Sequence, residues 1–281
     1  MGRILRALSR NKPAAAGLMV VLSMFALSIL APRIATHGPD DVDVTMRLKA
    51  PGVGGHILGT DRLGRDVFSR MIWGSRVSLK VGFVAVGIAV LIGVILGSLA
   101  GFYGGWLDSL IMRFCDLMLC FPTIFLILAV ITLLEPSIWN VMLVIGLTGW
   151  MSVTRFVRAE LLSLKNRDFV WAARNMGASD LRVITSHLLP NAMGPVFVTA
   201  TLGVAGAILT ESTLSFLGLG VQAPMASWGS ILADGKQFIT SAWWLTFYPG
   251  LAILITVLSY NLLGEGLREF LNPHARGEKL N

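Results

Sequence analysis

Residues 81–107, VGFVAVGIAVLIGVILGSLAGFYGGWL, contain no charged side chain. As an α-helix, a run of this length crosses a hydrocarbon core of roughly 30 Å, which needs about 20 apolar residues. Uncharged runs of comparable length recur along the chain at 14–31, 117–134, 136–154, 188–210 and 237–264. Backbone amides cannot stay unpaired in lipid, and no run alternates as barrel strands do. Each run is therefore predicted to be a helix.

The composition places the chain among membrane proteins. Hydrophobic residues make up 54% of the 281 positions and charged residues only 14%, and the mean hydropathy is +0.72; a soluble domain carries about 25% charged residues. We predict an all-α membrane protein with six transmembrane helices, at about 14–32, 81–104, 114–134, 137–155, 191–213 and 244–264. A further uncharged stretch, 212–233, is rich in Gly, Pro and Ser and is predicted to be an outer loop or a re-entrant segment.

The distribution of positive charge predicts the orientation. With six spans both termini lie on one side, and the segments on that side carry 14 Lys and Arg, whereas the later segments on the other side carry only Lys236. The positive-inside rule therefore places both termini in the cytoplasm. The loop from Arg33 to Lys80 conflicts with the rule, because it holds eight Lys and Arg on the predicted outer side.

The chain is predicted to divide into three parts: an anchor helix with an external loop (1–75), a five-span domain (76–265) and a cytoplasmic tail (266–281). The basic start followed by an apolar run is interpreted as an uncleaved helix, because the run exceeds the 7–15 residues typical of a signal peptide. Cys115 and Cys120 lie too close together in one predicted helix for a disulfide framework or a zinc site, and are predicted to be packing residues.

The connection 155–190 is long and basic, whereas most other connections between spans are short. Asp168 is placed to cap a short helix over 169–176, and Gly177 to end that helix in a left-handed conformation. Ser179 caps a second helix, 180–188, which Leu189-Pro190 is expected to stop. The residues alone leave two alternatives: a helical hairpin that docks a partner, or one that only connects two spans.

A spaced motif within this connection points to a known family. The pattern Trp171-Ala172-Ala173-x3-Gly177-x9-His187-x-Leu189-Pro190 resembles the cytoplasmic EAA loop of ABC import permeases, E-A-A-x3-G-x9-I-x-L-P. Every spacing agrees, but Trp171 stands in place of the glutamate and His187 in place of the isoleucine. A role that depends on the glutamate's charge therefore does not carry over, while the helix–glycine–helix geometry does. The two alanines keep one helix face small, so that a partner's backbone can approach.

Three more segments extend the resemblance over about 13–273. Residues 56–70, HILGTDRLGRDVFSR, are similar to the loop after the first helix of C-type peptide-importer permeases. Residues 215–222, SFLGLGVQ, with Ser227-Trp228-Gly229, and residues 249–268 are similar to later segments of the same proteins. The chain thus resembles the dipeptide/oligopeptide/nickel permease family, and most of all its dipeptide and oligopeptide C-type subunits.

This resemblance implies a type I ABC importer permease fold in the bacterial cytoplasmic (inner) membrane. It implies four kinds of partner: a second homologous permease, two cytoplasmic ATP-binding subunits, a periplasmic or lipid-anchored solute-binding protein, and membrane lipid. It also implies import of di- or oligopeptides, with nickel or another small solute as the alternative. The ATPase-coupling loop would comprise Asp168, Trp171, Ala172, Ala173, Gly177, His187, Leu189 and Pro190.

Missing motifs argue against other classes. There is no G-x4-G-K-[ST] phosphate loop, so ATP binding by that route is not expected. The four histidines, His37, His56, His187 and His274, are scattered, and neither H-E-x-x-H nor G-x-S-x-G occurs. No catalytic residue, cofactor or metal site is predicted, and the basic charge is assigned to topology rather than to nucleic acid. A membrane-embedded enzyme lacks its motifs, and a secondary transporter would need more buried ion-coupling residues.

Charged residues at membrane depth are costly and need an explanation. Glu211 is predicted near the outer boundary, where it either binds a peptide's amino group along the substrate path or satisfies backbone amides at a kink. Arg113 and Asp116, three residues apart on one helix, are predicted to pair with each other.

Two patterns concern packing and anchoring rather than chemistry. Gly93, Gly97 and Gly101 are spaced for close helix packing, within the bundle or against the partner permease. Trp243 and Trp244 are predicted to form an interfacial aromatic anchor.

Overall fold

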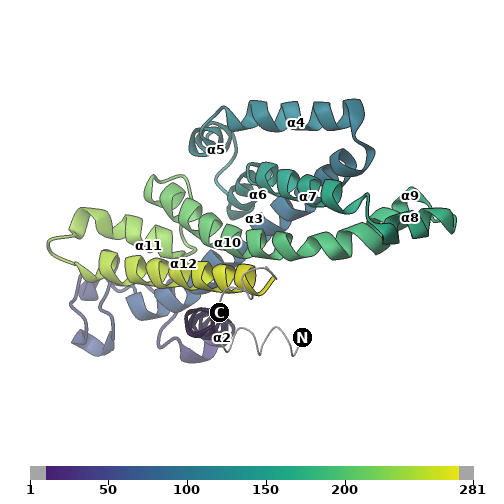
Figure 1. The fold of residues 1–281 in the computed structure, drawn as a ribbon. Coiled ribbons are helices and arrows are strands. Elements are labelled where there is room, and N and C mark those ends of the chain that lie inside the picture. Colours follow the sequence, from purple (N-terminus) through teal and green to yellow (C-terminus); the bar gives the residue numbers. More distant parts are fainter. Residues whose placement is uncertain (1–10, 272–281) are drawn as a thin grey trace.

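The computed structural model describes residues 11–271, and its regular elements in that range are helices (Figure 1). The longer ones are α2 (Lys12–Ile34), α3 (Val67–Tyr103), α4 (Gly105–Leu119), α5 (Thr123–Ile131), α6 (Ile138–Leu147), α7 (Trp150–Leu164), α8 (Asp168–Asn175), α10 (Leu189–Phe216), α11 (Trp228–Gly235) and α12 (Trp244–Leu271). The short ones are α9 (Asp180–Arg182), the 3₁₀ turns η1 (Val44–Met46), η2 (Val53–Gly55) and η4 (Lys236–Phe238), and the π-helical turn η3 (Val183–Leu188).

Within residues 11–271, five helices are long and apolar enough to cross a membrane, and the bent pair α4–α5 makes a sixth if it is one span. The predicted span 114–134 is broken in the structure, because α4 and α5 meet at an angle of 83°. The break falls at Phe121-Pro122. Proline disfavours the helical conformation in the residue before it and lacks the N–H that would continue the ladder.

Most helices extend beyond the uncharged runs that predicted them. Helix α3 begins at Val67, where the carboxylate of Asp66 accepts a hydrogen bond from the Ser69 N–H at 2.7 Å. The predicted domain boundary at 75/76 therefore lies inside this helix, and α12 likewise runs past residue 265 to Leu271. An uncharged run indicates where a helix is in lipid, whereas caps decide where it ends.

Helix α3 is the centre of the bundle and contacts α2, α4, α6, α7 and α10. Its predicted glycine face packs against α7 inside the chain. A Cβ atom on Gly93 would lie 2.5 Å from Val153 Cβ, and one on Gly97 would lie 2.6 Å from the Thr154 carbonyl oxygen. The third glycine, Gly101, approaches the Arg158 carbonyl oxygen in the same way, at 2.9 Å. The bundle itself thus accounts for the small-residue spacing.

A matched pair of glycines on α3 tests this packing. Gly97→Ala is expected to destabilise the solubilised protein by about 1–3 kcal/mol, the usual cost of overpacking, because the new methyl group would meet α7 backbone. Gly87→Ala is the control, because nothing lies within 4 Å of its added Cβ. The measurement is the thermal midpoint of monodisperse protein in detergent. Equal midpoints for the two variants would contradict the close α3–α7 contact.

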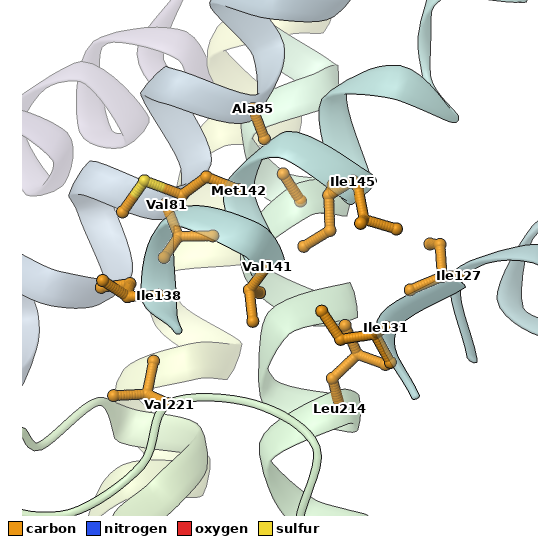
Figure 2. Packing of buried hydrophobic residues seen from close by; sticks show 12 residues of the cluster. Val81, Ala85, Ile127, Ile131, Ile138, Val141, Met142, Ile145, Leu214 and Val221 are labelled. Atoms are coloured by element: carbon orange, nitrogen blue, oxygen red, sulfur yellow. The ribbon is translucent and has the colours of Figure 1, made fainter. Parts of the chain in front are cut away.

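The largest hydrophobic cluster joins α3, α5, α6 and α10 (Figure 2). Ile127 and Ile131 of α5 point toward Leu214 of α10 and toward α6, which supplies Val141 and Ile145 (Figure 2). This contact holds the bent α5 against the bundle, while α4 packs on α3 and α7. The bend is therefore part of a packed structure.

Half of the segment 212–233 is helical, because α10 extends into it and α11 begins in it, and residues 217–227 connect the two helices. Helix α10 runs to Phe216, and Gly218, with φ of +84°, ends it in a left-handed turn. The chain then returns into α11, whose first residue, Trp228, donates from its indole N–H to the Met71 carbonyl at 3.1 Å. Helix α11 packs on α3, α10 and α12.

Only one of the two tryptophans predicted as an interfacial anchor is at the surface. Trp243 is exposed, but Trp244 is buried and its indole N–H donates to the Thr60 carbonyl at 3.1 Å. Trp244 packs with Val67 and Leu245, and it holds the segment between α2 and α3 onto α12. The prediction for Trp244 is wrong because its indole forms a hydrogen bond with a distant segment of the chain.

Candidate coupling surface and cavity

The predicted coupling connection folds as a helical hairpin at one end of the bundle (Figure 1). Helix α8 ends in a left-handed turn at Gly177, whose φ is +82°. The Gly177 N–H donates to the Arg174 carbonyl at 2.9 Å, and the Ala178 N–H donates to the Ala173 carbonyl at 3.1 Å. These two bonds form a Schellman motif and satisfy the last carbonyls of the helix. The predicted role of Gly177 in the turn is confirmed.

The helix after this turn does not stop at Pro190. The chain from Asp180 to Phe216 forms one continuous helix, so the predicted stop is wrong. A π-helical turn, η3, precedes the proline, and within it the Leu189 N–H donates to the Ile184 carbonyl. A wider turn relieves the clash that proline makes with the carbonyl of the preceding turn. The coupling connection is therefore in rigid continuity with the predicted fifth span.

The inner face of the hairpin is fixed to the bundle by apolar side chains. Val170 and Ala173 of α8 are buried, and they pack with Val157 and Leu161 of α7 and Leu188 of η3. The guanidinium of Arg174 lies over the Phe102 ring, 5.0 Å from its centroid. A force on the hairpin would therefore be transmitted to α3, α7 and α10 rather than absorbed by a loose loop.

The outer face carries large apolar side chains that no other part of residues 11–271 covers. Trp171 is 53% exposed, Met176 81% and Leu181 71%. Large apolar side chains exposed on a short rigid element are typical of a protein docking site. The motif resemblance singled out Trp171 but not Met176 or Leu181. Their place on the outward face follows from the turn at Gly177, which the spacing did predict.

The predicted coupling residues separate into exposed and buried groups. Asp168, Trp171, Ala172, Gly177 and Pro190 are exposed, whereas His187 and Leu189 are partly buried and Ala173 is buried. Of the two alanines only Ala172 is exposed, so the expectation that both keep an open helix face small is wrong. Asp168 is the first helical residue rather than the cap, and no side-chain hydrogen bond caps α8 or α9. Ser179 flanks α9 as predicted but makes no capping bond.

A cavity of about 350 Å³ lies between α3, α5, α6, α7 and α10. Its walls are mostly apolar and small, with glycines and alanines from α3 and α10. The polar side chains among its lining residues all carry hydroxyl groups: Thr123, Thr148, Ser152, Thr199 and Thr210. None of its lining residues is charged. Such a lining can hydrogen-bond a polar solute without selecting for its charge.

Glu211 is next to this cavity in sequence but does not line it. Its side chain is fully buried, and Oε1 accepts hydrogen bonds from the hydroxyls of Ser215 at 2.6 Å and Ser227 at 2.7 Å. Ser227 caps α11, so the carboxylate joins the end of α10 to the start of α11. This agrees with the structural alternative, although the partners are hydroxyls rather than the backbone amides expected.

A network of charges stabilises the opposite end of the bundle, where α11 meets the segment before α3. Arg65 Nε lies 2.7 Å from Asp61 Oδ2, and its Nη2 lies 3.3 Å from Asp234 Oδ2. Arg70 joins the same two carboxylates at 3.6 and 3.8 Å, and Arg62 reaches Asp234 at 3.4 Å. Three of the eight cations that conflict with the positive-inside rule are thus paired within the fold.

Ion pairs also connect α4 to α7, and they differ from the pair predicted. Asp116 pairs with Arg155 of α7, and Asp108 accepts two bonds from Arg158 of α7. The predicted Arg113–Asp116 pair does not form. A charged partner on the neighbouring helix replaces the weak pair within one helix. Of the two cysteines on this helix, Cys115 is buried as predicted, but Cys120 is exposed.

Comparison with known proteins identifies the family. The model of the binding-protein-dependent transport system inner membrane component matches residues 93–277, and that of the N-terminal transmembrane domain of oligopeptide transport permease C matches residues 1–51. A dipeptide transport system permease protein DppC of Alkalihalophilus pseudofirmus is 42% identical over 95% of this chain and 87% of that protein. The probable D,D-dipeptide transport system permease DdpC of Escherichia coli is 40% identical over 93% and 87%.

The chain therefore belongs to the family of binding-protein-dependent transport system inner membrane components. It is a multi-pass permease subunit of an ABC importer, and so a transport component rather than an enzyme. ABC importers work with an ATPase and a substrate-binding partner.

A solved structure confirms the fold. The permease of the MetNI methionine ABC transporter in an inward-facing conformation matches with a TM-score of 0.59 over 73% of this chain and 96% of that one. At 17% identity this match concerns the fold alone, the type I importer permease fold.

Proposed function

We propose that this permease imports di- or oligopeptides, together with a second homologous permease, two cytoplasmic ATPase subunits and an external solute-binding protein. In this proposal the hairpin 168–190 is the coupling element. Its exposed Trp171, Met176 and Leu181 seat in a groove of an ATPase. Closure of the ATPases then moves the hairpin, and α10 and α7 follow as rigid bodies.

The observation that carries the coupling role is the contrast between the two faces of the hairpin. The inner face is buried through Val170 and Ala173, and the outer face exposes apolar area on the same rigid element. A hairpin that only connected two spans would have no use for exposed Trp, Met and Leu side chains. Because Trp171 replaces a glutamate, we propose that the ATPase groove is apolar where it meets this residue.

The peptide substrate rests on two observations. The named relatives at about 40% identity are dipeptide and oligopeptide permeases. The cavity is lined by hydroxyls and small residues and not by charge, which suits solutes whose side chains differ in charge. We place the substrate path at this cavity, with Glu211 behind its wall as a support for the α10–α11 junction.

Transport by the reconstituted complex tests the substrate. With its partner subunits in proteoliposomes and its binding protein outside, the wild-type permease is expected to accumulate labelled short peptides only when ATP is inside. Acidic and basic peptides should enter at rates within about tenfold of each other, because no charged side chain faces the cavity. The assay measures initial uptake, with ⁶³Ni²⁺ as the competing substrate. Uptake of nickel without uptake of peptide would contradict the peptide substrate and support nickel, the alternative.

Cysteine accessibility tests the orientation with both termini inside. In a chain whose Cys115 and Cys120 are replaced, Asn166→Cys is expected to react only with reagent on the cytoplasmic side. Lys236→Cys and Val42→Cys are expected to react only from outside. All three positions are exposed, so folding does not hide them. The measurement is labelling of intact cells by an impermeant maleimide, and the reverse pattern would overturn the orientation.

A further inference from the structure

Two histidines far apart in the sequence meet at one carboxylate, between the ends of the first two long helices. His37 follows α2, His56 lies in the connecting segment, and Asp66 caps α3. His56 Nδ1 lies 2.9 Å from Asp66 Oδ1, and His37 Nδ1 lies 3.8 Å from Asp66 Oδ2. The two imidazole rings stack with centroids 4.7 Å apart. One donor atom from each residue lies within 4.8 Å of the others.

We propose that His37, His56 and Asp66 form a binding site for a divalent transition metal ion of the Zn²⁺ type. The ion would connect the end of α2 to the start of α3 on the side of the bundle opposite the coupling hairpin. The site is separate from the cavity and from the transported solute, and nothing in the proposed transport function requires it.

The distances fit such an ion after a small adjustment. With bonds of about 2.0–2.1 Å, two donors on one tetrahedral Zn²⁺ lie roughly 3.3 Å apart, and two imidazole centroids lie roughly 5 Å apart. The observed separations involve different carboxylate oxygens, 2.9 Å from His56 Nδ1 to Oδ1 and 3.8 Å from His37 Nδ1 to Oδ2, so binding of one ion requires His37 to shift toward Oδ1. The centroid distance of 4.7 Å is close to the second value. Two imidazoles and a carboxylate are the donor set that zinc shares with nickel and copper.

The surroundings prepare the carboxylate as a ligand. Oδ2 accepts from the Ser69 N–H at 2.7 Å and from the Thr36 hydroxyl at 3.4 Å, which fixes the plane of the carboxylate. Oδ1 carries only the bond from His56, and a metal ion would take the place of that hydrogen. His56 would then keep its hydrogen on Nε2.

Access to the site comes from His37. The Asp66 side chain is fully buried and that of His56 is 8% exposed, whereas His37 is 39% exposed. An ion can therefore enter from solvent on the His37 side and keep water there as a further ligand. The Thr36 hydroxyl, now 3.0 Å from His37 Nδ1, is exposed and can turn toward that water. A hydrogen bond between a buried histidine and Asp66 requires only His56. It does not explain why the His37 ring lies beside the same carboxylate.

Zinc titration of the full chain tests the site. The purified, histidine-tag-free chain in detergent is dialysed against ZnCl₂, and bound zinc is measured by elemental analysis. Wild-type protein is expected to bind one equivalent that both His37→Gln and His56→Gln lose. His187→Gln, which removes a histidine outside the site, should keep it. Equal zinc in wild type and the His37→Gln/His56→Gln double variant would overturn the site.

A second measurement separates the site from a folding defect. Because His37 is partly exposed, His37→Gln should elute and melt as the wild type does when zinc is absent. With zinc, hydrogen exchange of residues 36–56 is expected to slow in the wild type and to stay unchanged in His37→Gln. Slowing of equal size in both would show that zinc acts elsewhere and would overturn the proposal.

Discussion

Gly177→Val is expected to leave the permease in the membrane at normal abundance while separating ATP hydrolysis from solute uptake. The glycine has a φ of +82°, in which a side chain costs about 1–2 kcal/mol and a β-branched one the most. No atom lies within 4 Å of the added Cβ, so the effect is conformational rather than steric. The Schellman turn would shift, and Met176 and Leu181 would leave their places on the outer face.

The matched control for this change is Gly177→Asn. Asparagine tolerates the left-handed conformation better than other side chains, so this variant should retain most coupling. The measurements are co-purification of the ATPases and the ratio of solute imported to ATP hydrolysed, beside the amount of permease in the membrane. If Gly177→Val transports as the wild type does with the ATPases fully attached, the hairpin is only a connector. Equal loss in the two variants would contradict the conformational explanation.

Arg70→Met is expected to cause a large loss of stability at the end of the bundle opposite the hairpin. The Arg70 side chain is 3% exposed and contacts both Asp61 and Asp234, of which Asp61 is itself buried. Removing one member of a buried ion pair costs about 3–5 kcal/mol, because the remaining carboxylates lose a cation while still out of water. The change would loosen the contact between α11 and the segment before α3.

Arg76→Met, one and a half turns further along α3, provides the comparison. Arg76 is exposed and lies over the Trp73 ring, with 5.1 Å between its guanidinium carbon and the centroid, so its loss should cost less than about 1 kcal/mol. Thermal unfolding of the two purified variants, followed by size-exclusion chromatography, measures the difference. A midpoint for Arg70→Met equal to that of Arg76→Met would mean that the network adds nothing to stability.

The sequence alone determined the class of the protein, because the hydrocarbon core imposes a length on every span. Uncharged runs located the membrane helices, and the left-handed turn at Gly177 followed from glycine between two helical patterns. The glycines of α3 predicted close packing because a helix repeats every 3.6 residues. These features are local, so a short window of sequence contains the whole physical cause.

The tertiary structure decided what depends on contacts between distant segments. Trp244 was predicted at the membrane surface but is buried, since the Thr60 carbonyl offers its indole a partner 184 residues away. Asp116 forms an ion pair with Arg155 on another helix rather than with Arg113. The histidines looked scattered, so no metal site was predicted, yet folding brings His37 and His56 to Asp66. The spacing of residues along the sequence does not predict such contacts between distant residues, because they depend on how whole helices pack.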